Sequence, residues 1–249
     1  MIVPSTYVPK KNDLENKIIF ITGATSGIGR ALAIKLAQMG SKLIIHGRDA
    51  KKLESLHNKI GKIGYEPFIA NLDLEKAQGG DYKNSIELIE KKFQKIDGLV
   101  HNAAILGDRS PIEHYDIGLW QKVIHINLTT VFILTRCLLP FLKNAQNSSI
   151  IFTTSGVGNI GKAYWGSYSV SKFGIEGFYQ ILADELESTE VRVNCLDPGA
   201  TRTQMRKKAY PSENPNNVTK PEDILKPYLY LLSDESKSIN GERIACQSH

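Results

Sequence analysis

The sequence predicts an α/β fold: a single doubly wound domain with a parallel sheet of about seven strands and helices on both faces. Short apolar runs alternate along the chain with segments whose apolar residues recur at helical spacing. The first run, Ile18 to Ile21, is apolar at every position, which is typical of a strand buried on both faces of a parallel sheet. No repeat or linker interrupts the alternation, so we expect one domain over residues 1–249.

A glycine-rich turn follows the first strand and opens the first predicted helix. Gly23, Gly27 and Gly29 are spaced Gly-x-x-x-Gly-x-Gly, and apolar residues then recur at helical spacing up to Met39. A strand, a glycine turn and a helix N-terminus together aim backbone N–H groups and the helix dipole at a phosphate. The alternative is an ordinary tight turn. The phosphate loop of nucleotide hydrolases is excluded, because no Gly-Lys-Ser/Thr follows.

The end of the second predicted strand, residues 43–45, bears on the choice of cofactor. An NAD site places a carboxylate there to bind the ribose 2′-hydroxyl, whereas a nearby arginine suits the 2′-phosphate of NADP. Gly47 offers no side chain and Arg48 follows it, so we favour NADP over NAD. Asp49 argues for NAD, but it also stands where the N-cap of a helix starting near Ala50 would lie.

The rest of the chain continues the alternation. Strands are predicted at 66–72, 98–101, 149–154, 191–196 and 243–246, and helices at 86–93, 120–142, 164–186 and 221–232. Two segments fall outside this pattern. Residues 1–16 contain two prolines and are expected to form an extended lead-in, and residues 201–218 are polar and are expected to form a mobile substrate lid.

Composition narrows the class of protein. Hydrophobic residues make up 41% of the chain, enough for a sizeable core, and we find no apolar run near the ~20 residues that span a bilayer. The net charge of +5 is spread along the chain, which gives little support for nucleic-acid binding. Three well-separated cysteines suggest neither a disulfide framework nor a metal site. We therefore expect a cytoplasmic protein that acts on small molecules.

Two side chains of the helix predicted at 164–186 suggest proton transfer. Tyr168 and Lys172 lie one helical turn apart on the same face. A free phenol has a pKa of about 10, and a neighbouring ammonium lowers it towards neutrality. Such pairs also arise by chance on solvated helix faces. Asn127 lies on an apolar stripe of the helix predicted at 120–142, where a structural and a functional amide are equally compatible with the sequence.

Several motifs occur in an order that resembles the short-chain dehydrogenase/reductase family across nearly the whole chain. They are Thr22-Gly23-x-x-x-Gly27-x-Gly29, Asn102-Ala103, Asn127, Ser155 thirteen residues before Tyr168, Lys172, and Pro198-Gly199 with Thr201. Stretches 101–108, 165–172 and 198–206 are similar to a group of poorly characterised bacterial short-chain oxidoreductases. The resemblance implies a Rossmann-type fold. The sequence departs from the family pattern at Ala104, where glycine is usual, and at Ser26, where NADP-binding relatives often carry a basic residue.

The resemblance also implies a role for each matching residue. Tyr168 would be the general acid or base, Ser155 would bind the same substrate oxygen, and Lys172 would lower the Tyr168 pKa and hold the nicotinamide ribose. Asn127 would anchor a water that links Lys172 to solvent. The residues expected to bind the cofactor are Gly23, Thr25, Ser26, Gly27, Ile28 and Gly29 at the pyrophosphate, Arg48 at the ribose, Asp73 and Leu74 at the adenine, Asn102 and Ala103 on the adenosine side, and Tyr168, Lys172, Pro198, Gly199 and Thr201 at the nicotinamide.

The leading functional hypothesis is hydride transfer between NADP(H) and a carbonyl or secondary alcohol substrate. One alternative is a 3-oxoacyl thioester reductase whose basic residues meet an acidic carrier protein, and another is a non-catalytic NADP-sensing protein. The basic residues concerned are Arg202, Arg206, Lys207 and Lys208, and the expected borders of an apolar substrate pocket are Tyr164, Trp165, Met205 and Tyr210. The resemblance further implies a homodimer or homotetramer built through the two long helices.

Overall fold

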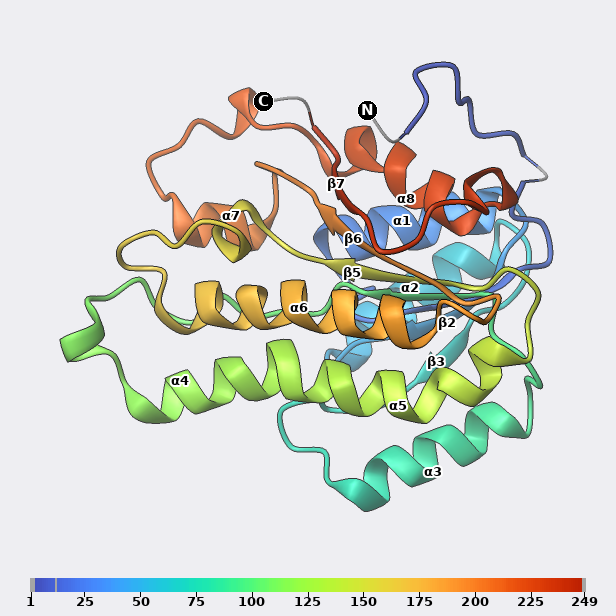
Figure 1. Ribbon diagram of the computed structural model, residues 1–249, viewed down its shortest axis with the longest axis horizontal. Coiled ribbons are helices and arrows are strands. Elements are labelled where there is room, and N and C mark those ends of the chain that lie inside the picture. The colour runs from blue at the N-terminus through green and yellow to red at the C-terminus, as the bar shows by residue number, and fades with distance from the viewer. Residues whose placement is uncertain (1–2, 12, 248–249) are drawn as a thin grey trace.

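The computed structural model describes residues 3–11 and 13–247, and within them one seven-stranded sheet forms with every pairing parallel. The strand order β3-β2-β1-β4-β5-β6-β7 starts at the middle of the sheet and winds outward to both edges (Figure 1). The predicted doubly wound α/β fold is therefore confirmed. Of the predicted lead-in over residues 1–16, positions 1, 2 and 12 lie outside the described residues.

The strands lie where the apolar runs predicted them, with ends displaced by a residue or two. They are β1 (Ile18–Ile21), β2 (Lys42–His46), β3 (Phe68–Ala70), β4 (Gly98–His101), β5 (Ser149–Thr153), β6 (Arg192–Asp197) and β7 (Arg243–Ala245).

Helices cover both faces of the sheet (Figure 1). Side chains alternate along a strand, so Ile19 and Ile21 of β1 pack into the hydrophobic core on one face while Phe20 packs into the core on the other. The first face carries α1 (Gly27–Gln38), α2 (Ala50–Gly61) and α8 (Lys226–Leu232). The second carries α3 (Gly79–Glu90), α4 (Ile117–Ile124), α5 (Thr130–Lys143) and α6 (Gly166–Glu185).

Two predicted helices are interrupted in the structure. The helix expected at 120–142 is divided by a π-helical turn, His125–Thr129, which separates α4 from α5 and contains Asn127. The helix expected at 221–232 begins as a 3-10 turn, Pro221–Ile224, before α8. Pro227 then falls in the first turn of α8, where its missing N–H removes no hydrogen bond from the helix.

One helical stretch qualifies the expectation that no segment is long and apolar enough to cross a membrane. Residues Ile117–Lys143 form a helical stretch of 27 residues, π-helical turn included, and an 18-residue window within it has a mean hydropathy of 1.5, so the stretch meets the requirement by length and composition. In the fold this stretch packs against α3, α6 and β4, and part of it is buried in the core on the second face of the sheet. Its apolar residues therefore serve the packing of the domain.

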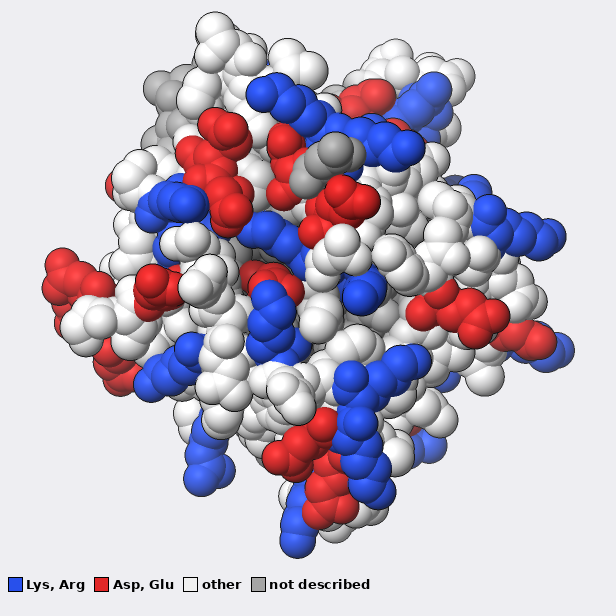
Figure 2. Space-filling view, turned by 90° about the vertical axis from the view of Figure 1, so that its right-hand side faces the viewer, with Lys and Arg blue, Asp and Glu red and all other residues white. Residues whose placement is uncertain are grey.

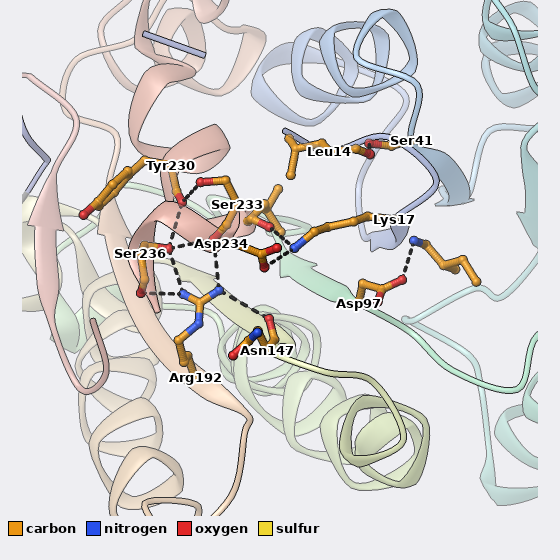
Figure 3. Close-up of polar contacts among 12 residues, drawn as sticks. Leu14, Lys17, Ser41, Asp97, Asn147, Arg192, Tyr230, Ser233, Asp234 and Ser236 are labelled. Carbon is orange, nitrogen blue, oxygen red and sulfur yellow. Dashed lines mark hydrogen bonds and ion pairs between the residues drawn. The ribbon is translucent and has the colours of Figure 1, made fainter. Parts of the chain in front are cut away.

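Charged side chains gather where the strands begin. Lys17 Nζ donates to Asp234 Oδ1 at 2.8 Å (Figure 3). The Asp97 carboxylate accepts from Ile18 N and from the Lys95 side chain, each at 2.8 Å. On the surface opposite α7 (Gln204–Ala209), positive and negative side chains are interspersed (Figure 2). Lys17 and Asp97 at this end of the sheet therefore each have a partner of opposite sign.

Arg192 lies among these groups and is almost fully buried. Its guanidinium donates to the Ser236 carbonyl at 3.1 Å, to the Ser236 hydroxyl at 2.9 Å and to the Ser233 carbonyl at 3.4 Å (Figure 3). Burial lowers the pKa of Arg192 to about 10, so the side chain is charged near neutrality. Arg192 thus ties β6 to the segment that follows α8.

Candidate active site

The opposite ends of the strands open into one cleft with a volume of 340 Å³. The segments after β1, β2, β3, β4, β5 and β6 all contribute lining residues, and α7 covers one side. In an open parallel sheet this edge, at the point where the strand order reverses, is where ligands bind. The cleft therefore lies where the topology predicts it.

The glycine turn after β1 fits the diphosphate of a dinucleotide. Gly23 and Gly27 have φ angles of 65° and 51°, which favour glycine. A Cβ on Gly23 would lie 2.8 Å from Ala103 Cα, so the two backbones touch. Ser26 makes no side-chain cap on α1, which leaves the first N–H groups of this helix available to an anion.

Two polar side chains hold the turn in place. Asn102 Nδ2 donates to the Thr22 and Gly23 carbonyls, both at 3.2 Å, and Thr22 Oγ1 accepts from the N–H groups of Asn102 and Ala103 at 3.0 Å. His46 Nδ1 accepts from Gly23 N at 3.4 Å while His46 Nε2 donates to Leu72 O at 2.7 Å. Burial lowers the pKa of His46, which keeps its Nδ1 free to accept.

The two residues that bear on cofactor choice lie differently at the end of the cleft beside β2. Arg48 lines the cleft, and 66% of its side chain is exposed, with Glu75 at 3.8 Å. Asp49 is the N-cap of α2, where its Oδ1 accepts from Lys52 N at 3.1 Å, and it does not line the cleft. The N-cap interpretation of Asp49 is confirmed, and Arg48 is the cation beside this part of the cleft.

Tyr168 and Lys172 lie on α6 and are both almost fully buried while lining the cleft. Burial raises the pKa of Tyr168 to about 12, an effect that Asp197 strengthens and the adjacent Ser155 side chain partly offsets. The Lys172 ammonium donates to Thr153 O at 2.7 Å and lies 5.8 Å from the centre of the Tyr168 ring. Burial likewise lowers the pKa of Lys172 to about 8.

These values correct one expectation from the sequence. Lys172 was expected to lower the Tyr168 pKa towards neutrality, but here burial of the phenol dominates and its pKa rises. The reason is geometric, because the ammonium points at the Thr153 carbonyl rather than at the phenol oxygen. In this state Tyr168 is a protonated donor, and the Lys172 ammonium, with a pKa near 8, is the more easily deprotonated of the two groups.

Asn127 lies behind the cleft rather than in its lining. Its Oδ1 accepts from Ile105 N at 2.8 Å, and its Nδ2 donates to Ile105 O at 2.9 Å and to Ser171 Oγ at 3.1 Å. The amide therefore fastens the segment after β4 to α6. Its expected role as a water anchor stays a prediction.

The expected substrate border is met in part. Trp165 and Met205 line the cleft and cluster with Leu106, Val157, Tyr168 and Ala209. Tyr164 instead is 54% exposed at a φ of 70°, and Tyr210 packs against the same cluster, with its ring centre 6.0 Å from that of Trp165. Neither lines the cleft.

The segment expected to be a lid contains α7 and is fastened at several points. Arg109 Nη1 donates to Ala209 O at 2.7 Å, Lys208 Nζ donates to Gly107 O at 3.1 Å, and Arg206 forms a two-pronged ion pair with Glu213 at 2.7 and 2.6 Å. The segment thus closes the substrate side of the cleft in this structure. Its mobility stays a prediction.

Most residues that the sequence assigned to the cofactor line the cleft. They are Gly23, Thr25, Ser26, Gly27, Ile28, Arg48, Asp73, Leu74, Asn102, Ala103, Tyr168, Lys172, Pro198, Gly199 and Thr201. Gly29 does not, because it packs against the Gly23 carbonyl within the turn. Sequence reasoning missed His46, Ile105, Leu106 and Gln204, although each closely follows a predicted strand or lies in the predicted lid.

Comparison with known proteins agrees with this fold and cleft. The profile of the short chain dehydrogenase family matches residues 17–214, and the chain belongs to this family. It is 39% identical over 236 residues to YciK, an uncharacterized oxidoreductase of Escherichia coli strain K12, an alignment that covers 94% of this chain and 93% of the relative.

Two solved structures of relatives contain a dinucleotide. A short chain dehydrogenase from Shigella flexneri 2a strain 301, in complex with NADP, has a TM-score of 0.94 at 39% identity and covers 96% of this chain and 100% of its own. A short chain dehydrogenase from Escherichia coli CFT073, in complex with NADPH, gives the same values. The protein is therefore an oxidoreductase of the NAD(P)-dependent kind.

Proposed function

We propose that the protein transfers hydride between NADP(H) and a carbonyl or secondary alcohol, with Ser155, Tyr168 and Lys172 as its catalytic residues. One observation carries this proposal: the Tyr168–Lys172 pair, Ser155 and the glycine turn line the same cleft. The nicotinamide ring, when bound, supplies or accepts the hydride. The chain itself must position the two reactants and move one proton.

The proton step follows from the burial of Tyr168. With a pKa of about 12 the phenol is protonated at neutral pH, as a donor to a carbonyl oxygen must be. Ser155 supports the same oxygen with a second hydrogen bond, which stabilises the negative charge that develops there. The Lys172 ammonium lies 5.8 Å from the centre of the Tyr168 ring, carries its charge near neutrality and can return a proton to the phenolate.

We infer that NADP is preferred over NAD. Arg48 lies at the end of β2 with an exposed guanidinium, whereas the nearby carboxylate of Asp49 is engaged as an N-cap. A 2′-phosphate would replace Glu75 as the partner of Arg48. The complexes of the two relatives with NADP and NADPH support the same choice.

The thioester alternative rested on four basic residues near the site, and three of them are engaged within the protein. Arg206 pairs with Glu213, Lys208 donates to Gly107 O, and Arg202 Nε donates to Val218 O at 3.3 Å. Lys207 is exposed. These contacts do not favour an acidic carrier protein over a small carbonyl compound.

The long helices support the expected homodimer or homotetramer. Large apolar side chains are exposed on α5 at Phe132 and on α6 at Val170, Phe173 and Ile181. Covering them against a second copy would remove apolar surface from water. Light scattering coupled to size-exclusion chromatography measures the assembly directly.

Replacing Tyr168 tests the proposed function. Tyr168→Phe removes the phenol oxygen and keeps the ring, so turnover of NADPH with a panel of ketones and aldehydes should fall about 10²- to 10⁴-fold. Tyr164→Phe, at an exposed tyrosine outside the cleft, serves as the matched control and should keep wild-type turnover. Full turnover by Tyr168→Phe contradicts the mechanism. Tight NADPH binding by a wild-type protein that reduces nothing in the panel supports a cofactor sensor instead.

A further inference from the structure

A second group of buried charges lies directly behind the Tyr168–Lys172 pair. Glu176 follows Lys172 by one turn of α6, and Asp197 ends β6. Both side chains are almost fully buried, with 11% and 4% exposed. Arg243, which begins β7, joins them through Nε to Glu176 Oε1 and Nη2 to Asp197 Oδ2, each at 2.9 Å. One guanidinium therefore bridges two carboxylates that come from different elements.

Each carboxylate also contacts backbone or side chain next to the reacting groups. Glu176 Oε1 accepts from Thr154 Oγ1 at 2.7 Å, and Thr154 immediately precedes Ser155. Asp197 Oδ1 accepts from Gly199 N at 3.0 Å, and Gly199 lines the cleft. The bridged carboxylates thus hold the segment after β5 and the turn after β6 against the middle of α6.

The charges of this region balance. Two carboxylates, the Arg243 guanidinium and the Lys172 ammonium sum to zero in a setting where water is largely excluded. Both carboxylates favour the charged form of Lys172, and Asp197 also disfavours ionisation of Tyr168. Loss of Glu176, Asp197 or Arg243 would leave a net buried charge beside Tyr168 and Lys172. Such a charge shifts the pKa values of both groups, because little water screens it.

The other titratable groups around the cluster are neutral near pH 7. Burial lowers the pKa of His101, behind Lys172, to about 3 and raises the pKa of the surrounding thiols and phenols. These thiols and phenols are Cys195, Cys246, Tyr179 and Tyr228. The balance beside the pair is therefore set by Glu176, Asp197 and Arg243.

We propose that Glu176, Arg243 and Asp197 are positioning residues that set the pH at which the Tyr168–Lys172 pair exchanges its proton. The inference rests on the proposed function, because it concerns the same proton. Arg243 offsets one of the two carboxylate charges, and the other is balanced by the Lys172 ammonium, which lies beside the phenol. The sign of the effect does not depend on which member of the pair loses its proton first, since a removed negative charge favours deprotonation of both.

Two single substitutions test the proposal through opposite shifts. Glu176→Gln removes a negative charge and should move the midpoint of the pH profile of alcohol oxidation down by about 1 pH unit. Arg243→Gln removes a positive charge and should move the same midpoint up by about 1 pH unit. The measurement is kcat/KM for alcohol oxidation with NADP from pH 5 to pH 11, together with the circular dichroism spectrum of each variant as a check of folding.

Three further variants separate charge from shape. Glu176→Gln combined with Arg243→Gln restores the balance and should return the midpoint close to the wild-type value. Arg243→Lys keeps the charge and alters the bridge, so it should also stay close to wild type. Glu185→Gln, at an exposed position on the same helix, is the matched control and should not move the midpoint. If one of the Gln variants does not fold, the comparison of Arg243→Lys with the remaining variant carries the test.

The outcomes also separate this inference from the proposed function. An active wild type whose midpoint is unchanged by both Gln variants, or moves in one direction for both, overturns the positioning role and leaves the function intact. A wild type that oxidises no alcohol and reduces no carbonyl overturns the proposed function itself. Opposite shifts that cancel in the double variant support both.

Discussion

The two ends of the same parallel sheet bury charged side chains in different ways. Where the strands begin, the Arg192 guanidinium is surrounded by carbonyls and a hydroxyl of the segment after α8, and it faces no cleft. Where the strands end, Lys172 has one described acceptor, Thr153 O, and borders the open cleft beside Tyr168. A buried charge thus indicates a functional site only when part of its surroundings is left open to a ligand.

Replacing each buried cation by methionine should separate the two roles most strongly. Lys172→Met is expected to lower turnover about 10²-fold or more, because proton transfer loses its charged partner, with little loss of stability. Arg192→Met is expected to lower the free energy of unfolding by about 1–3 kcal/mol, because buried acceptors lose their donor, with turnover unchanged. Urea unfolding and steady-state kinetics measure the two effects. Equal loss of turnover in both folded variants would remove the distinction.

The titration of Lys172 should also make the stability of the protein depend on pH. Lys172 has a folded pKa of about 8 against 10.5 in the unfolded chain, so the folded state releases this proton first. The free energy of unfolding should therefore rise by about 2–3 kcal/mol as pH increases from 8 to 10. The cost of burying the ammonium is fully present below pH 8.

Lys172→Met provides the matched comparison, because it removes the titrating group. Denaturant unfolding of both proteins across this range gives the difference between them. The window ends near pH 10, where Tyr168 begins to contribute with the opposite sign because its folded pKa is raised. A wild-type curve parallel to that of Lys172→Met would show that Lys172 titrates in the folded state as it does in water.

Arg48 and Asp49 allow a comparison of two neighbouring charges, one that lines the cleft and one that does not. Arg48→Gln should weaken NADPH binding about 10-fold, because one charge-assisted contact to the 2′-phosphate is lost, and should leave NADH binding unchanged. Fluorescence titration with both cofactors measures this preference. Lys52→Gln, one turn into α2, is the control. Equal weakening of NADPH and NADH binding would place the 2′-phosphate elsewhere.

Asp49→Ala should have the smallest effect, and it should change stability rather than cofactor preference. Loss of the N-cap of α2 is expected to lower the free energy of unfolding slightly, while the ratio of NADPH to NADH affinity stays the same. Thermal unfolding and cofactor titration of this variant check both parts. A changed affinity ratio would mean that Asp49 reaches the ribose after all.

The contrast between regions also explains what the sequence could predict. The strands were predictable because a parallel sheet covered on both faces requires unbroken apolar runs such as Ile18 to Ile21. The π-helical turn at Asn127 was not, because its hydrogen bonds go to Ile105 and Ser171, far away in sequence. Tertiary contacts of this kind, rather than the local sequence, therefore determine where the helix widens into a π-helical turn.

The candidate site divides in a similar manner. Gly23 and Gly27 of the glycine turn line the cleft as predicted, because the conformation of this turn follows from its own sequence. The pKa of Tyr168 was not predictable, since it depends on how far α6 is buried and on where the Lys172 ammonium points. The position of Tyr164 likewise depends on the left-handed backbone just before α6.

A crystal structure of the protein in complex with NADP tests the central claim most directly. We expect the pyrophosphate on the N–H groups between Gly23 and Gly29, the 2′-phosphate at Arg48, and the nicotinamide ring facing the Tyr168 hydroxyl beside Pro198 and Gly199. A dinucleotide bound with its nicotinamide ring away from Tyr168, or outside this cleft, would contradict the account.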